Sequence, residues 1–130
     1  MNKHSQPVKY FFDKISKNYD QNFINHKSSK NYTFLKRKKI ILNSLSKKKG
    51  KFLDVATGSG EITSILVNKN NFSHSTLVDI SELMLNKCKQ KIKIKKRVIF
   101  LNKDLTLIDS RVKYDHIICL GVIAHYPNID

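Results

Sequence analysis

The fold of this 130-residue chain is decided by the stretch FLDVATGSGEI, which runs from Phe52 to Ile62. Its apolar residues 52–56 predict a short buried strand, Gly58-Ser59-Gly60 predicts a tight turn, and the apolar residues that follow have helical spacing. A strand, a glycine turn and a helix in this order let backbone N–H groups approach a nucleotide-type ligand closely. Ligand binding at an α/β sheet is therefore the leading interpretation.

The composition is typical of a single globular domain. Hydrophobic residues make up 40% of the chain, and no apolar run reaches the roughly 18 residues of a membrane span. The N-terminus has no continuous apolar region of the kind that a signal peptide needs. Cys88 and Cys119 do not form a spaced pair, so the sequence predicts neither a disulfide framework nor a metal site. A reducing cytoplasm is the expected location.

The net charge of +15 comes almost entirely from lysine, because the only arginines are Arg37, Arg97 and Arg111. Aromatic residues are not interleaved with the basic runs, as they often are in nucleic-acid-binding surfaces. We interpret these runs as solvated lysine faces, and nucleic acid is not the favoured partner.

Helical and strand patterns alternate along the chain, which is typical of a doubly wound α/β fold with a mainly parallel sheet. Strands without alternation of apolar and polar residues indicate a sheet covered on both faces. The expected helices cover residues 8–20, 33–47, 61–68 and 82–94, and the expected strands cover residues 51–56, 75–79, 98–101 and 114–121.

Two of these helices carry more detailed expectations. Residues 21–33 are polar and predict a loop, after which Thr33 would cap the second helix. Ser81 would cap the helix that starts at Glu82. The residues expected on the buried faces of these two helices are Leu35, Ile41, Leu42, Leu45, Leu83, Leu85, Cys88 and Ile92.

Ligands of such sheets bind beyond the carboxyl ends of the strands. There the sequence places Asp79, the Asn102-Lys103-Asp104 segment and Leu120-Gly121, in addition to the glycine turn. Gly60 and Asp79 have about the separation at which an acidic residue reaches ribose hydroxyls in a nucleotide-binding βαβ unit. A carboxylate suits a vicinal diol because it accepts two hydrogen bonds.

Two nucleotide-type ligands compete at this point. A dinucleotide fingerprint needs a third glycine, but Thr63 stands at that position, and Glu61 would add negative charge beside a pyrophosphate. S-adenosylmethionine carries no phosphate and has a sulfonium and an ammonium group. The carboxylates of Asp54, Glu61, Asp79 and Asp104 suit such a cationic ligand better than a diphosphate.

The chain resembles the class I S-adenosylmethionine-dependent methyltransferases in four motifs that occur in order over residues 8–128. The matching segments are residues 52–62, 77–85, 102–105 and 114–125. The first two motifs are similar to those of the ubiquinone and menaquinone C-methyltransferases, whereas the segment from Gly121 to Asn128 departs from that subgroup. The resemblance implies a Rossmann-like methyltransferase fold, S-adenosylmethionine as cofactor, and methyl transfer to a small-molecule acceptor.

The resemblance also implies a role for each matching residue. Asp54 would orient the glycine loop, and the backbone of Ala56, Gly58, Gly60 and Leu120 would approach the methionine part of the cofactor. Asp79 would hold both ribose hydroxyls and Asp104 would accept from the adenine amino group. Packing on the adenine would come from Ile80 and Leu105.

The resemblance divides the chain into an N-terminal helical lid segment, residues 1–49, and the first half of the cofactor-binding α/β domain, residues 50–130. Tyr19 would close over the cofactor. His125 lies where a general base could reach the substrate. No catalytic residue is assigned, because the sulfonium already activates the methyl group and positioning supplies most of the rate.

The sequence accounts for four strands, whereas the methyltransferase fold has seven. We therefore expect a fragment of a longer protein that is inactive in isolation and associates through the open edge of its last strand. Two alternatives stay open: a truncated cofactor-binding or scaffold module without activity, and an RNA or DNA methyltransferase. The sequence leaves the acceptor atom, carbon, oxygen or nitrogen, undetermined.

Overall fold

A computed structural model describes residues 3, 5–24 and 29–126 of the chain. The described part holds a four-stranded, entirely parallel sheet, which confirms the predicted Rossmann-like α/β fold. Its strand order is β3-β2-β1-β4. The strands are β1 (Lys49–Val55), β2 (Asn71–Asp79), β3 (Val98–Asn102) and β4 (His116–Cys119).

The sheet order creates a switch point between β1 and β4. The chain winds outward from β1 through β2 to β3, and then returns to pair β4 with the other side of β1. Because crossovers between parallel strands are right-handed, the two connections on the outward path cross one face of the sheet and the returning connection crosses the other. Ligands of doubly wound sheets bind at such a switch point, outside the carboxyl ends of the strands.

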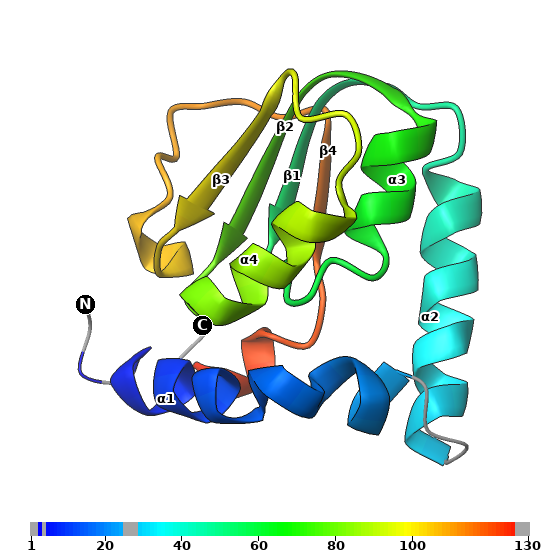
Figure 1. Ribbon diagram of the computed structural model, residues 1–130. Coiled ribbons are helices and arrows are strands. Elements are labelled where there is room, and N and C mark those ends of the chain that lie inside the picture. The colour runs from blue at the N-terminus through cyan, green and yellow to red at the C-terminus, as the bar shows by residue number, and fades with distance from the viewer. Residues whose placement is uncertain (1–2, 4, 25–28, 127–130) are drawn as a thin grey trace.

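Helices α3 (Thr63–Lys69) and α4 (Glu82–Lys91) cover one face of the sheet (Figure 1). The core on this face contains Phe52 and Phe72, whose rings stack with their centroids 4.8 Å apart. Buried residues of both helices complete the cluster, together with partly buried side chains of β3, β4 and α2. Most of the hydrophobic core therefore lies between the sheet and these two helices.

The opposite face is only thinly covered. Leu53, Val55 and Val78 pack there against the connection from β3 to β4, which contains a short 3-10 turn, η3 (Leu105–Leu107). On β3 and β4, burial alternates, and Ile99 and Ile117 are 50% and 59% exposed. The expectation of strands covered on both faces is therefore wrong for β3 and β4, because the crossover on this side supplies no long helix within residues 103–115.

The N-terminal region is more helical than predicted. Helix α1 (Ser5–Ile15) continues through η1 (Ser16–Asn18) into a π-helix, η2 (Asp20–Ile24), and α2 (Ser29–Ser44) begins before Thr33. The loop predicted over residues 21–33 is therefore wrong for residues 21–24 and 29–33, and so is the cap at Thr33; residues 25–28 lie outside the described residues. The polar residues at 21–24 and 29–33 belong to helices rather than to a loop.

The buried stripe of α2 also differs from the prediction. Phe34, Ile41, Leu42 and Leu45 pack against the core, whereas Leu35 is 51% exposed. Positions 34, 41, 42 and 45 share one side of an α-helix, and position 35 lies off that stripe.

The cap of α4 is as predicted. Ser81 Oγ accepts a hydrogen bond from Met84 N at 3.2 Å, and Leu85 and Cys88 are buried. Leu83 is 50% exposed, so its predicted burial is wrong. Strand β2 starts at Asn71, earlier than predicted, because the polar residues at its start still pair with β1. Within the described ranges, no helix is long and apolar enough to cross a membrane.

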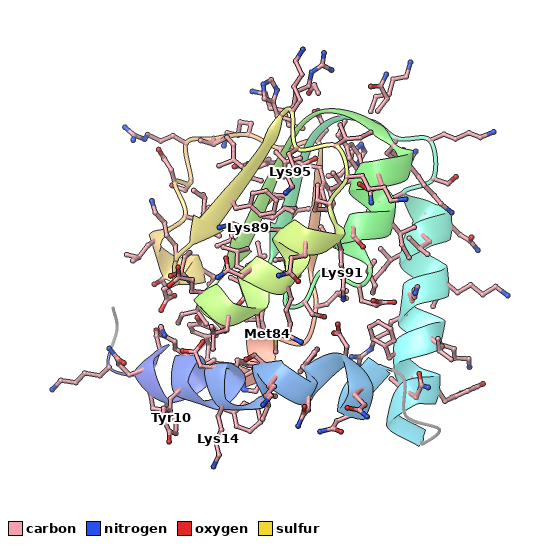
Figure 2. All side chains as sticks on the ribbon, viewed as in Figure 1. Tyr10, Lys14, Met84, Lys89, Lys91 and Lys95 are labelled. Atoms are coloured by element: carbon pink, nitrogen blue, oxygen red, sulfur yellow. The ribbon has the colours of Figure 1, made fainter. Side chains whose placement is uncertain are left out.

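Helix α1 lies across the end of the sheet toward which the strand arrows point (Figure 1). The carboxyl ends of the strands therefore face the N-terminal helices. Figure 2 shows Met84 between α4 and α1, while Tyr10 and Lys14 of α1 point away from the sheet. The space between α1 and the strand ends is where the predicted site residues gather.

Two glycines after β1 have left-handed backbones but different surroundings. A Cβ on Gly60, at φ +76°, would lie 2.5 Å from Cys88 Sγ and 3.0 Å from Cys88 Cα. A Cβ on Gly58, at φ +57°, would meet no atom within 4 Å. Gly60 is thus required for close packing on α4, whereas Gly58 faces open space at the strand ends.

We expect Gly60→Ala to lower the free energy of unfolding by roughly 2–5 kcal/mol, because overpacking adds to the cost of a left-handed backbone. Gly58→Ala should lower the free energy of unfolding by only about 1–2 kcal/mol, because a Cβ there meets no atom and only the left-handed backbone conformation is unfavourable. Urea unfolding of the two variants measures both values, and equal losses would contradict the assignment.

Candidate functional site

The loop that follows β1 turns sharply at the carboxyl end of the sheet. Ala56, Gly58 and Gly60 all have positive φ, at 62°, 57° and 76°. Thr57 N donates to Val78 O at 2.9 Å, so the loop stays attached to β2 as it leaves the sheet. This succession of left-handed residues exposes backbone atoms rather than side chains toward the strand ends, which permits close approach of a ligand.

Asp79 fixes this loop from the end of the neighbouring strand. Its Oδ2 accepts from Gly58 N at 2.7 Å, and its Oδ1 accepts from Ser81 N at 2.8 Å. Burial raises the pKa of Asp79, and the two backbone N–H groups oppose that shift. Each oxygen keeps a further lone pair for a ligand hydroxyl. The glycine turn and Asp79, which the sequence places at the ends of two strands, are therefore in direct contact.

Asp54 lies beneath the loop in a buried polar cluster. Thr63 Oγ1 donates to Asp54 Oδ2, and Thr57 Oγ1 donates to Thr63 Oγ1 at 3.1 Å. Burial raises the pKa of Asp54 to about 7, and the Asp79 carboxylate adds to the shift. Burial also raises the pKa of Cys88 to about 11, so its thiol stays protonated and acts as core.

Two cavities lie on either side of the loop. The first, which we call the Asp79 cavity, has a volume of about 130 Å³. The second, which we call the Arg37 cavity, has a volume of about 170 Å³ and includes Asp54. Both cavities are lined by Tyr19, Ala56, Gly58, Leu120 and Gly121.

Most of the predicted binding residues line these cavities. Ile80 and Leu105 line the Asp79 cavity together with Asp79 itself. Gly60 lines neither cavity, since it packs on Cys88.

Asp104 also lines neither cavity, and its carboxylate is already engaged. It caps η3 through Thr106 N at 2.9 Å, and it accepts from Ser5 Oγ and from Tyr126 Oη. Acceptance from an adenine amino group stays a prediction for Asp104, and it would need one of these partners to move.

The N-terminal helices are attached to the sheet around the cavities. Ser81 Oγ donates to Asp13 Oδ1 at 2.6 Å, and Lys91 Nζ lies 2.7 Å from Asp20 Oδ2. Lys91 also lies 3.3 Å from Glu61, which pairs with Lys38 of α2 at 3.1 Å. This ion-pair cluster joins η2, α4, α2 and the glycine loop; Figure 2 places Lys91 on the side of α4 that faces α2.

Tyr19 lies over the loop from this N-terminal segment. Burial raises its pKa, with further contributions from the Asp79 and Asp20 carboxylates. The sequence prediction that Tyr19 lies near the site is therefore consistent with its position in both cavity walls.

His125 also lines the Asp79 cavity. Its ring packs edge to face on the ring of Phe12, with the two ring centroids 5.5 Å apart. Its role as a general base stays a prediction.

Sequence reasoning missed several lining residues. Val8, Phe12 and Tyr126 line the Asp79 cavity, and Phe34 and Arg37 line the Arg37 cavity. The apolar face of the first helix was a usable signal for Phe12, since a helix beside the strand ends must point its apolar residues at them. Nothing in the local pattern around Arg37 distinguishes it from the neighbouring lysines.

The raised pKa of Asp54 predicts a pH dependence of stability. The folded chain holds this proton up to about pH 7, whereas the unfolded chain releases it near the ordinary value of 3.8. The folded state therefore binds more protons in between, and the contribution of Asp54 to stability falls as the pH rises from about 4 to 7.

We expect Asp54→Asn to remove this contribution. The difference in unfolding free energy between the wild type and the variant should change by up to about 1.4 kcal/mol per pH unit in that window and level off above it. Urea unfolding at a series of pH values measures the difference. A constant difference across the window would show that Asp54 is ionised throughout.

Residues 53–130 match the sequence model of a family described as a methyltransferase domain. A search of curated proteins found no significant match. Among solved structures, the chain is similar to magnesium protoporphyrin IX methyltransferase from Synechocystis with bound S-adenosylmethionine. The TM-score is 0.77 and the identity 19%, over 98% of this chain and 66% of that one.

Two further similar structures are a methyltransferase from Thiobacillus denitrificans in complex with S-adenosylhomocysteine and a putative one from Methanococcus maripaludis. The TM-scores are 0.64 and 0.61, the identities 18% and 20%, and the matches cover 92% and 99% of this chain. They cover 46% and 56% of those chains, so this chain spans about half to two thirds of the structures it matches. At these identities the likeness shows the fold. The family match extends over more than half of the sequence, and this chain therefore belongs to the methyltransferase domain family.

Proposed function

We propose that this chain binds S-adenosylmethionine and is part of a methyltransferase acting on a small-molecule acceptor. The observation that carries the proposal is the contact between Asp79 Oδ2 and Gly58 N at 2.7 Å. It places a glycine loop and a buried carboxylate on one cavity, which is the arrangement that recognises a ribose beside a close backbone approach. The solved structures with bound S-adenosylmethionine or S-adenosylhomocysteine support the choice of ligand.

The local chemistry favours this cofactor over a dinucleotide. Thr63, at the position of the third glycine in a dinucleotide fingerprint, donates to Asp54 and so belongs to the buried cluster. The carboxylates of Glu61 and Asp79 line the cavities beside the loop. Negative charge in these walls would oppose a pyrophosphate and favour a sulfonium.

The chain's own residues would act mainly by positioning. The bound cofactor would supply a methyl group already activated on a sulfonium. Asp79 would hold the ribose hydroxyls, and the backbone around Ala56, Gly58 and Leu120 would hold the methionine part. Holding the two reactants in a productive geometry can account for most of the barrier reduction, without a general base.

The N-terminal helices would close this site as a lid. Phe12 and Tyr19 line the Asp79 cavity from α1 and the residues that follow it. The contact of Asp13 with Ser81 and that of Asp20 with Lys91 tie this segment to the sheet. Polar contacts of this kind can break and re-form without exposing a large apolar surface, which suits a segment that must admit and release a ligand.

A small acceptor in the cytoplasm fits the remaining observations. The basic charge is carried by lysines spread over the chain rather than by arginines beside aromatic residues. One similar solved structure is a porphyrin methyltransferase. The acceptor itself stays open.

Calorimetry with S-adenosylhomocysteine and with NAD tests the proposal on the wild-type chain. We expect S-adenosylhomocysteine to bind and NAD to show no binding, because of the carboxylates beside the loop. Tighter binding of NAD would overturn the assignment of the cofactor.

Asp79→Ala should weaken binding of S-adenosylhomocysteine by about 1.5–3 kcal/mol, the range for hydrogen bonds to a charged group. Asp109→Ala is the matched control, because it removes the same charge at an exposed ion pair with Arg111. Asp79→Ala also removes the acceptor of Gly58 N and Ser81 N. Thermal unfolding of Asp79→Ala must therefore show that the variant is folded at the temperature of the titration. A folded Asp79→Ala chain with unchanged affinity would place the ribose elsewhere.

Self-association through the β4 edge is a second part of the proposal. In the described sheet β4 pairs only with β1, and Ile117 of β4, which lies on the thinly covered face, is 59% exposed. An unpaired apolar edge is a template for another strand.

We expect Ile117→Lys to reduce the mass of any assembly of the chain, because a lysine on an edge strand opposes pairing. Leu83→Lys is the control, since Leu83 is 50% exposed on α4, away from the edge. Sedimentation velocity at several concentrations measures the result. A wild-type chain that stays monomeric at all concentrations would contradict the proposal.

A further inference from the structure

Helix α2 carries apolar side chains on two opposite sides. One set packs on the core of the protein. Three further large hydrophobic residues of the same helix are exposed to solvent: Tyr32 by 62%, Leu35 by 51% and Ile40 by 63%. One apolar stripe is enough to attach a helix to a core, so the fold does not account for the second set.

The exposed hydrophobic residues share their side of the helix with exposed polar ones. With about 3.6 residues per turn, positions 32, 35, 36, 39, 40 and 43 fall within one arc, opposite to the positions that pack on the core. Lys36 Nζ lies 5.2 Å from the centroid of the Tyr32 ring, so a charge and an aromatic ring are side by side here. We call this surface the α2 stripe: Tyr32, Leu35, Lys36, Lys39, Ile40 and Asn43.

The α2 stripe faces outward. In Figure 1, α2 forms the margin of the molecule, with α3 and the sheet on one side of it and no labelled element on the other. Of the lysines in this helix, Lys38 points inward and pairs with Glu61 at 3.1 Å. Lys36 and Lys39 make no ion pair with any residue that the structure describes.

The charge of this region has a single sign. Residues 29–49 contain eight Lys and Arg and no Asp or Glu. A partner of the α2 stripe must therefore be anionic and must also accept apolar side chains. Both requirements are met by the headgroup layer of a membrane that contains acidic lipids.

The residue types favour a lipid surface over a protein. Protein interfaces are depleted of lysine and enriched in arginine, whereas the basic residues of the α2 stripe are Lys36 and Lys39, and Arg37 lies off it. A lysine can lay its alkyl stem along an apolar surface while its ammonium group reaches the headgroups. Tyrosine is enriched at the same depth of a bilayer, which suits Tyr32.

We infer that the α2 stripe docks on an anionic lipid surface, with α2 lying in the plane of the headgroups. The side chains of Leu35 and Ile40 enter the boundary between headgroups and acyl chains, and the lysines contact the acidic headgroups. The inference goes beyond the proposed function and does not depend on it. Because Phe34 and Arg37 of the same helix line the Arg37 cavity, docking would place that cavity near the lipid surface.

The first test is co-sedimentation of the wild-type chain with vesicles of phosphatidylcholine, alone or mixed with phosphatidylserine. We expect binding to the mixed vesicles that weakens as salt is added, and much weaker binding to phosphatidylcholine alone. Lys36→Gln combined with Lys39→Gln should weaken binding to the mixed vesicles at least tenfold, since each lysine at the surface contributes roughly fivefold.

The matched control for this pair is Lys51→Gln combined with Lys113→Gln. It removes the same charge from exposed positions in β1 and in the connection from β3 to β4. It should weaken binding less than about threefold, because those lysines lie outside the proposed contact.

A second variant tests the apolar part of the contact. Ile40→Ser should weaken binding to the mixed vesicles roughly fivefold, because a partly buried aliphatic side chain is lost from the lipid boundary. Leu107→Ser is the matched control, since Leu107 of η3 is 59% exposed and should not contact lipid. Neither variant should lower the midpoint of thermal unfolding, which circular dichroism measures.

Three outcomes would overturn the inference. Equal binding to both kinds of vesicle would show that acidic lipid is not recognised. Equal losses in the two pairs of lysine variants would mean that the net charge of +15 accounts for the binding without the α2 stripe. No binding of the wild type to either vesicle would leave a protein as the partner of this surface. None of these measurements requires a cofactor, so their outcome is separate from that of the proposed function.

Discussion

The Asp79 carboxylate holds together the two loops on which the site depends. One oxygen accepts from Gly58 N and the other from Ser81 N, so the turn after β1 and the start of α4 are fixed to the end of β2. Ser81 then uses its own hydroxyl twice, to cap α4 and to donate to Asp13 of α1. A single side chain at a strand end thereby determines the shape of the glycine loop, the start of a helix and the position of the N-terminal segment.

The polar cluster beneath the loop explains why a carboxylate is buried in the core at all. An unpaired buried charge is costly, and the raised pKa of Asp54 shows how the protein lowers that cost, by retaining a proton up to about pH 7. Thr63 and Thr57 continue the hydrogen bonds from Asp54 toward Cys88. The same cluster fixes the first turn of α3, so the position that would be the third glycine of a dinucleotide loop here carries a hydroxyl.

The features that could be predicted from the sequence are those whose signal is local. The run from Phe52 to Ile62 predicted a strand and a turn, and Ser81 predicted a helix start, because each depends on residues adjacent in the chain. The early start of α2 and the exposure of Leu35 could not be predicted, since the sequence around Thr33 offers a cap that tertiary packing overrides. Arg37 was missed because it lines its cavity together with residues that are distant in the sequence.

The extent to which each face of the sheet is covered could also not be predicted from local sequence patterns. Ile99 and Ile117 lie in apolar runs that resemble strands buried on both sides, yet both are half exposed or more. Which face a crossover covers depends on the handedness of the connection and on the strand order. How well it covers that face depends on whether the connection forms a helix, and the segment between β3 and β4 forms only η3. The periodicity of residues within a strand indicates neither which face of the sheet is covered nor how well it is covered.

The distribution of charge ties the fold to its proposed ligand. The chain has a net charge of +15, which by itself would repel a cationic cofactor. Acidic residues are few, and six of the ten gather around the strand ends, on the cavity walls and in the contacts of the N-terminal helices: Asp13, Asp20, Asp54, Glu61, Asp79 and Asp104. Partly buried charges are screened less by salt than the exposed lysines, so the ionised members of this group, which do not include the protonated Asp54, set the local potential. A basic surface and an acidic site are thus compatible, because the field that a bound ligand meets is determined by the nearest and least solvated charges.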